Sequence, residues 1–181
     1  MGRGGRRDWD EPDAGLPILA LRIEPLLAAL MAHEVEFVII GGFCLFAHGV
    51  IRATKDIDIL PAPARDNLAR LSDALADLNA MPLFADDFDP AELAIKLNVE
   101  GLSAGGNWVL GTSFGRLDIM QAVEGVRDYA DLRTRAVSVH VPDVGPCWFA
   151  SVDDLIAMKT AAGRPQDEID VASLERARGK D

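Results

Sequence analysis

The chain has 181 residues, of which 49% are apolar and 26% charged, a composition that predicts an ordinary folded core and excludes a largely disordered protein. Its 29 acidic residues outnumber the 18 basic ones, and the net charge of −11 disfavours duplex nucleic acid as a partner while suiting a chain that holds divalent cations. No apolar run approaches the ~18 residues that a transmembrane helix needs, and no secretory signal follows the basic N-terminus.

This length predicts one domain. Residues 1–15 are rich in glycine and charge, so we interpret them as a flexible leader before a single domain over residues 16–181. The cysteines, Cys44 and Cys147, lie far apart and lack the spacing of metal ligands, which indicates two reduced thiols. Together with the lack of a membrane segment, they favour a cytoplasmic protein.

Apolar spacing and turn residues outline the first half of the chain. The pattern predicts a helix over 16–33, a strand over 35–40, a short helix over 43–49, a strand over 56–60 and an amphipathic helix over 64–79. Pro25 is expected to kink the first helix or to mark its true start. Gly41-Gly42 is expected to end the first strand, and Pro61 to stop the second.

The second half begins with a predicted loop over 81–90 and a segment over 91–99 that fits either a helix or a strand. Further on, the pattern predicts hairpin strands over 107–110 and 116–121, a short helix over 129–134, strands over 136–141 and 147–149, and helices over 151–162 and 166–177. A capping box at Ser151 opens the first of these last two helices. Gly163 stops it, and Arg164-Pro165 starts the next.

Two carboxylates in the strand over 56–60 indicate the chemistry. Side chains alternate along a strand, so Asp56 and Asp58 point to one side while Ile57 and Ile59 point into the core. Two like charges that face the same way are unfavourable unless a cation lies between them. Magnesium fits, because it takes oxygen ligands and keeps substrate phosphates in its shell. The alternative interpretation is an exposed acidic face on an edge strand.

The surroundings favour a phosphate site. Gly41-Gly42 precedes a short helix, whose free N–H groups can bind phosphate oxygens, and a Cβ there would block their approach. Asp118 lies among apolar residues in a predicted strand. The three carboxylates converge if this strand pairs with the strand that carries Asp56 and Asp58. Asp118 could instead form a structural ion pair with Arg116 or Arg52.

The stretch from Gly41-Gly42 through Arg52-Ala-Thr-Lys-Asp-Ile-Asp-Ile resembles the signature of the nucleotidyltransferase superfamily, the DNA polymerase beta-like fold. In that signature a Gly-Gly or Gly-Ser turn and a short helix precede Asp-x-Asp, and a third Asp on a later strand corresponds to Asp118. The tail Lys159-Thr-Ala-Ala-Gly-Arg-Pro-Gln-Asp167 resembles that of small bacterial members close to the type IV toxin, or abortive-infection, nucleotidyltransferases.

The resemblance covers roughly residues 35–175. It implies an α/β (α+β) nucleotidyltransferase fold, with a mixed central β-sheet flanked by helices and a C-terminal helical pair over about 151–177. It also implies a homodimer, because small relatives are commonly dimeric.

The activity that the resemblance implies is Mg²⁺-dependent transfer of an NMP from an NTP to a hydroxyl acceptor, with release of pyrophosphate; Mn²⁺ is the alternative ion. Asp56 and Asp58 would be metal-binding catalytic residues. Asp118 would complete the second metal site and act as, or help to position, the base. Gly41 and Gly42 would hold the β- and γ-phosphates. The acceptor stays open between RNA, protein and a small hydroxylated molecule.

Several basic residues are further candidates. Arg52 is expected to bind the nucleotide, with pairing to the acidic residues as the alternative. Lys159 lies in an otherwise apolar helical segment, where its ammonium either reaches a phosphate or extends to solvent. We expect Arg164 and Asp167 to form a local pair or cap. The competing hypothesis for the whole chain is a catalytically inactive module that binds a nucleotide or a partner, for example in a toxin–antitoxin pair.

Overall fold

The computed structural model describes residues 20–83 and 96–179, so the predicted leader over 1–15 and most of the segments predicted over 81–90 and 91–99 lie outside the described residues. The helices are α1 (Ile23–Ala32), α2 (Gly41–Ala47), α3 (Arg65–Asp77), α4 (Val99–Ser103), α5 (Tyr129–Arg135), α6 (Val152–Ala162) and α7 (Pro165–Arg178). The strands are β1 (Phe37–Ile40), β2 (Asp56–Pro61), β3 (Met81–Pro82), β4 (Asn107–Thr112), β5 (Gly115–Met120), β6 (Val137–Val141) and β7 (Gly145–Phe149).

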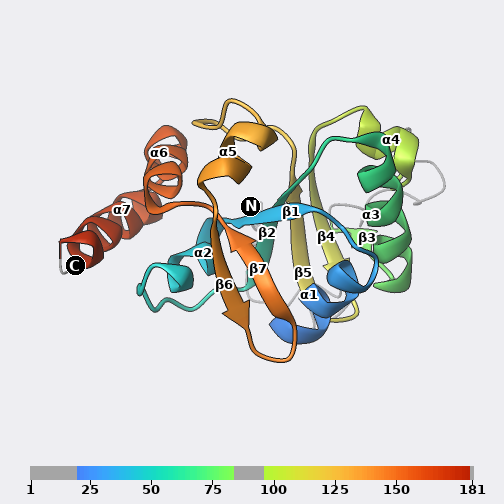
Figure 1. The fold of residues 1–181 in the computed structure, drawn as a ribbon, viewed down its shortest axis with the longest axis horizontal. Coiled ribbons are helices and arrows are strands. Elements are labelled where there is room, and N and C mark those ends of the chain that lie inside the picture. Colours follow the sequence, from blue (N-terminus) through green and yellow to red (C-terminus); the bar gives the residue numbers. More distant parts are fainter. Residues whose placement is uncertain (1–19, 84–95, 180–181) are drawn as a thin grey trace, which may run out of the picture.

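The strands form one sheet in the order β3-β4-β5-β2-β1-β7-β6 (Figure 1). The pairs β2–β5 and β1–β7 are parallel, and the other neighbours are antiparallel. The predicted mixed sheet and the predicted hairpin, which is β4–β5, are therefore confirmed. Among the described residues, every helix is too short or too polar to cross a membrane.

The boundaries near the start of the chain differ from the predicted ones. Helix α1 begins at Ile23, so Pro25 lies in its first turn, where its missing N–H costs no helical hydrogen bond. Gly41 and Gly42 form the first turn of α2 instead of preceding it. Pro61 is the last residue of β2 and pairs with Phe37 of β1, beyond the end of the β2–β5 pairing.

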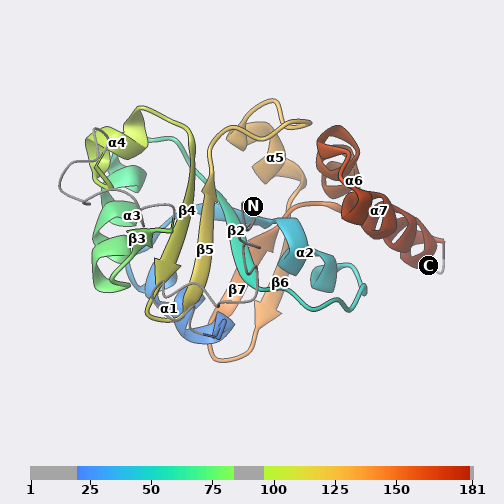
Figure 2. The same ribbon diagram turned by 180° about the vertical axis from the view of Figure 1, so that it is seen from behind.

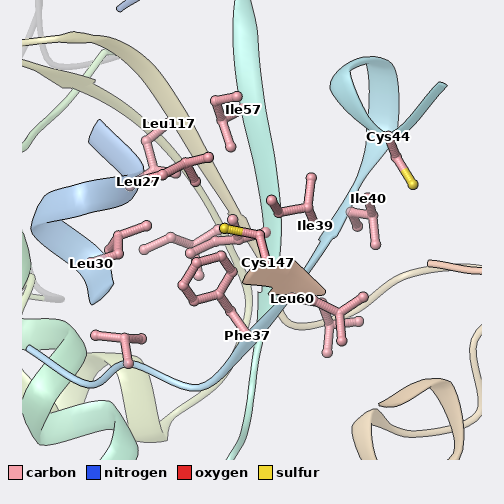
Figure 3. Close-up of a cluster of buried hydrophobic side chains, with 14 of the residues drawn as sticks. Leu27, Leu30, Phe37, Ile39, Ile40, Cys44, Ile57, Leu60, Leu117 and Cys147 are labelled. Atoms are coloured by element: carbon pink, nitrogen blue, oxygen red, sulfur yellow. The ribbon is translucent and has the colours of Figure 1, made fainter. Parts of the chain in front are cut away.

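One face of the sheet packs against α1 and α3 to make the core. Leu27 and Leu30 point from α1 toward the strands that carry Phe37 and Leu117 (Figure 3). Helix α1 lies in front of β5 in Figure 1 and behind it in Figure 2. Because side chains alternate along a strand, the residues between the core-facing side chains of β2 and β5 lie on the opposite face of the sheet.

The predicted C-terminal helical pair is present as α6 and α7. The Ser151 side chain accepts a hydrogen bond from the Asp154 N–H, which is the N-cap half of the predicted capping box. The Ser151 hydroxyl in turn donates to the Asp154 carboxylate over 2.5 Å. Gly163 ends α6 in the left-handed region with φ 61°. Pro165 is the first residue of α7. The Asp167 carboxylate accepts from the Arg164 N–H over 3.3 Å and from the Arg164 Nε over 2.6 Å, so the predicted local pair is confirmed.

Candidate active site

Strands β2 and β5 bring the carboxylates to one face of the sheet. Their parallel register sets Asp58 beside Asp118 and Asp56 beside Arg116. The intervening residues of β2, Ile57 and Ile59, are fully buried on the core side. Parallel neighbours lie about 4.8 Å apart, so the pairing that would make the three carboxylates converge is present.

Arg116 lies among these carboxylates. Its Nε donates to Asp118 Oδ1 over 2.8 Å and its Nη2 to Asp118 Oδ2 over 2.6 Å. The same guanidinium lies 3.7 Å from Asp56 Oδ2. The ion pair considered for Asp118 therefore forms with Arg116, as a bidentate contact of the strong type.

Asp58 has an unusual electrostatic environment. Burial raises its pKa to about 7, and the charges of Asp56 and Asp118 add to the increase, while the Gly42 N–H and Arg116 act against it. A carboxylate of this kind favours any ligand that supplies positive charge to it. Its surroundings, three carboxylates on one face, provide the oxygen donors that Mg²⁺ and Mn²⁺ prefer. The residues present therefore fit a divalent cation.

The structure nevertheless holds these carboxylates in an arrangement suited to Arg116. Within residues 20–83 and 96–179, no group of three or more His, Cys, Asp or Glu side chains stands in the geometry of a ready metal site. Both oxygens of Asp118 accept from Arg116, so a cation that binds these oxygens has to displace the guanidinium.

The glycine pair is required by close packing. Gly41 has φ +67°, and a Cβ at this position would lie 1.9 Å from Asp58 Oδ2. A Cβ on Gly42 would lie 2.9 Å from Thr54 Oγ1, and the hydroxyl of Thr54 donates to the Asp56 carboxylate over 3.2 Å. Glycine at these positions thus lets the carboxylate strand approach the first turn of α2, a reason that the argument from phosphate binding did not include.

Arg52 and Lys159 meet at a carboxylate that the sequence analysis gave no role. Asp170 Oδ2 accepts from Arg52 Nη1 over 2.6 Å and from Lys159 Nζ over 2.7 Å. The Lys159 ammonium also donates to Asp167 over 3.2 Å, and Arg164 pairs with Asp167 over 2.6 Å. We call these five residues the C-terminal ion cluster. Lys159 is only 6% exposed, so its ammonium does not extend to solvent.

The ion cluster joins the C-terminal helices to the loop between α2 and β2. Arg52 Nη1 lies 3.9 Å from the position that a Cβ on Gly42 would take, so its guanidinium stands beside the first turn of α2. The charge of Asp58 also acts on Arg164. The cluster therefore lies next to the carboxylates and gives Arg52 a fixed place at the site.

The sequence carried a pattern that could have identified Asp170. A lysine in an apolar helical segment needs a buried counter-charge, and Asp167 and Asp170 are three residues apart, on one face of the following helix.

Comparisons with known proteins give the fold. No protein-family profile and no curated protein sequence matches the chain. Among solved structures, the antibiotic-resistance factor ANT(2'')-Ia in solution matches with a TM-score of 0.53 and 16% identity, over 87% of this chain and 81% of that one. The lincosamide antibiotic adenylyltransferase LnuA, bound to lincomycin, matches with a TM-score of 0.52 and 15% identity, over 86% of this chain and 98% of that one.

At these identities the likeness is one of fold. The chain has a mixed α/β fold, as its sequence predicted, and shares this fold with the two structures. The two matched proteins are antibiotic-modifying or antibiotic-resistance proteins, and neither match bears on the predicted relationship to abortive-infection toxins.

Proposed function

We propose that this chain is a divalent-cation-dependent nucleotidyltransferase that moves an NMP from an NTP to a hydroxyl acceptor and releases pyrophosphate. The observation that carries the proposal is the register of β2 and β5, which puts Asp58 beside Asp118 with Asp56 on the same face. The raised pKa of Asp58 supports it, because a site that concentrates negative charge is prepared for a cation. The fold of the matched structures is a further support.

In this proposal Asp56 and Asp58 bind Mg²⁺, or Mn²⁺ in its place, and Asp118 completes the second metal position. A divalent cation held by these carboxylates would supply positive charge to the triphosphate and to the attacking hydroxyl. Asp118 orients that hydroxyl and accepts its proton as the oxygen attacks the α-phosphorus in line. Pyrophosphate is the leaving group.

The remaining residues hold the nucleotide. Gly41 and Gly42 form the first turn of α2 beside the carboxylates, and the β- and γ-phosphates lie against this turn in this proposal. Arg52 contacts the triphosphate from its place beside the first turn of α2. Lys159 acts through other residues, since its ammonium is buried and bonded to Asp170, which in turn holds Arg52.

The acceptor is best sought first among small hydroxylated molecules with ATP as donor. One matched structure is an adenylyltransferase bound to lincomycin, and a net charge of −11 disfavours RNA. RNA and protein form the other arms of the test. Cytoplasmic location, a homodimer and membership of a toxin–antitoxin pair stay predictions.

The test incubates the protein with labelled ATP, GTP, CTP or UTP, Mg²⁺ and cell lysate, and then identifies the labelled product. The double variant Asp56→Asn/Asp58→Asn is expected to lose at least about a hundredfold in transfer rate, because metal charge stabilisation is worth several kcal/mol. The control is Asp66→Asn/Asp73→Asn, which removes the same charge from two exposed positions of α3. Equal transfer by the wild type and the site variant would contradict the proposal.

Calorimetry separates this activity from the inactive-module hypothesis. An enzyme binds an NTP in a metal-dependent manner and transfers from it, whereas an inactive nucleotide-binding module binds without transfer. A partner-binding module binds none of the four NTPs.

A further inference from the structure

We propose that Arg116 is a built-in competitor of the divalent cation: it holds the carboxylates together in the metal-free protein and leaves Asp118 for the nucleotide phosphates when cation and NTP bind. The inference rests on the proposed function, because it assigns a switch to the same site. It makes Arg116 a residue that couples cation binding to nucleotide binding.

The contacts of Arg116 are with the atoms a cation would need. Both carboxylate oxygens of Asp118 accept from the guanidinium, over 2.8 and 2.6 Å, and Asp56 Oδ2 lies 3.7 Å away. Arg116 is therefore placed between two of the three carboxylates, on the face that they share. Mg²⁺ demands near-octahedral oxygen ligands at about 2.0–2.1 Å. A cation at that distance from Asp118 would repel a guanidinium bound to the same oxygens.

The charges of the site explain why the arginine is needed without a cation. Asp56, Asp58 and Asp118 face one another across two strands, and their mutual repulsion contributes to the raised pKa of Asp58. Arg116 supplies a positive charge to the group and opposes that increase. Removing it without supplying a cation would leave three like charges on one partly buried face, which is unfavourable.

Arg116 can exchange its contact with Asp118 for a contact with the phosphates of a bound nucleotide. The Arg116 side chain is 36% exposed while that of Asp118 is 8% exposed, so the arginine reaches solvent beside a nearly buried carboxylate. Guanidinium groups bind phosphate oxygens in the same bidentate manner as carboxylates. The exchange of Asp118 for a phosphate then frees Asp118 for its part in the reaction. By linkage, NTP and cation must strengthen each other's binding.

The test measures Mn²⁺ binding without nucleotide, from the paramagnetic resonance signal of free Mn²⁺. Arg116→Met removes the charge and keeps much of the side-chain length. It is expected to tighten Mn²⁺ binding by about 5- to 150-fold, the usual range of such couplings. The enhancement of Mn²⁺ affinity by a non-hydrolysable NTP is expected to shrink by the same factor. Arg116→Lys should fall between the wild type and Arg116→Met.

Two further measurements keep the test decisive. Arg116→Met should unfold at a lower temperature than the wild type in EDTA, and Mn²⁺ should restore its stability. Should it fail to fold, Arg116→Gln, which is neutral but can still donate to Asp118, replaces it in both assays. The control is Arg65→Met, which makes the same charge change at the exposed Arg65–Glu100 pair and should leave Mn²⁺ affinity unchanged.

Equal Mn²⁺ affinity of the wild type and Arg116→Met would overturn the inference and make Arg116 a structural partner of Asp118. This outcome differs from a failure of the proposed function. In that case Asp56→Asn/Asp58→Asn would bind Mn²⁺ as the wild type does and the wild type would transfer no nucleotide.

Discussion

At the scale of single residues, a Cβ added at Gly41 should cost stability in two ways, through backbone strain and through a collision with a neighbouring side chain. The φ of Gly41 is +67°, and that of Gly49 is +74°, but only at Gly41 would a Cβ collide with another residue, Asp58. Gly49→Ala should therefore cost only the strain of the left-handed region, about 1–2 kcal/mol. Gly41→Ala should cost more, because Asp58 must also turn away.

Mn²⁺ titration distinguishes the two glycine variants. Gly41→Ala is expected to lose Mn²⁺ affinity at least about tenfold, since even a 1.4 kcal/mol loss has that effect. Gly49→Ala should bind as the wild type does. Equal losses in the two variants would show that general destabilisation, and not the contact with Asp58, is responsible.

The raised pKa of Asp58 predicts how the free energy of unfolding depends on pH when the protein is in EDTA. Burial and like charges raise the pKa of Asp58 to about 7, so the folded chain binds a proton that the unfolded chain has released. Its contribution to stability is fully present below the ordinary aspartate pKa of about 4 and is lost as pH rises to about 7. The free energy of unfolding should therefore fall over this range, by an amount on the order of a few kcal/mol.

Urea unfolding at about pH 5 and about pH 8 measures this fall. The variant Asp58→Asn has the same shape and no titrating group, so its stability should fall less between the two values. The difference between the two proteins isolates Asp58 from the other groups that titrate. An equal fall in both would contradict the raised pKa.

At the scale of elements, the C-terminal ion cluster links α6 and α7 to the candidate site through the contact between Asp170 and Arg52. Lys159 is buried, and Asp167 and Asp170 are each 2% exposed. Lys159→Ala leaves both carboxylates short of one partner, and breaking a buried pair in this way costs about 3–5 kcal/mol. We expect a loss of about 3 kcal/mol, the lower value, because Arg52 and Arg164 still reach the two aspartates.

Urea unfolding checks this loss against a variant of α7. Arg178→Ala breaks the exposed pair with Asp153 and should cost at most about 1 kcal/mol. If the two variants lose the same amount, the buried cluster contributes no more than a surface pair.

Elements with strong local patterns were predictable, and those fixed by distant partners were not. Helix α3 shows helical spacing of leucines, and the hairpin β4–β5 has a turn rich in glycine, so both were found within a few residues. Strand β3, with two residues, exists only through its pairing with β4. Helix α4 has five residues and depends on the Asn98 cap, which the sequence analysis did not use.

Part of the candidate site was likewise predictable from local sequence, and part depends on distant partners. The alternation Asp56-Ile-Asp58 is a local pattern, and it correctly placed both carboxylates on the face away from the core. Arg116 lies two residues before Asp118 on the same strand, so the alternation of side chains along β5 already places the two on one face and favours Arg116 over Arg52 as the partner of Asp118. Arg52 instead pairs with Asp170, 118 residues further along the chain, a distance that local reasoning does not span.

At the scale of the whole molecule, one sheet runs from β3 to β6 and one buried core spans it. We expect a single cooperative unfolding transition, as small single domains show. Trp108 lies on β4 and Trp148 on β7, near opposite ends of the strand order, so their fluorescence reports unfolding of the two ends of the sheet separately. In a Trp9→Phe background, Trp108→Phe and Trp148→Phe each leave one of these tryptophans as a probe.

Urea midpoints from the two fluorescence signals and from circular dichroism should coincide within error. Separate midpoints would show that the part of the sheet with β6 and β7 unfolds independently. The predicted single domain over residues 16–181 would then be wrong.

The parallel pairing of β2 with β5 has a consequence for how the chain folds. Asp58 and Asp118 are neighbours across the sheet but sixty positions apart along the chain, and contacts of such long sequence separation form slowly. Asp118, however, carries its own counter-ion two residues earlier on the same strand, in Arg116. Strand β5 can therefore dock with its charge already balanced, and the repulsion from β2 that would slow this late step is reduced before any cation is present.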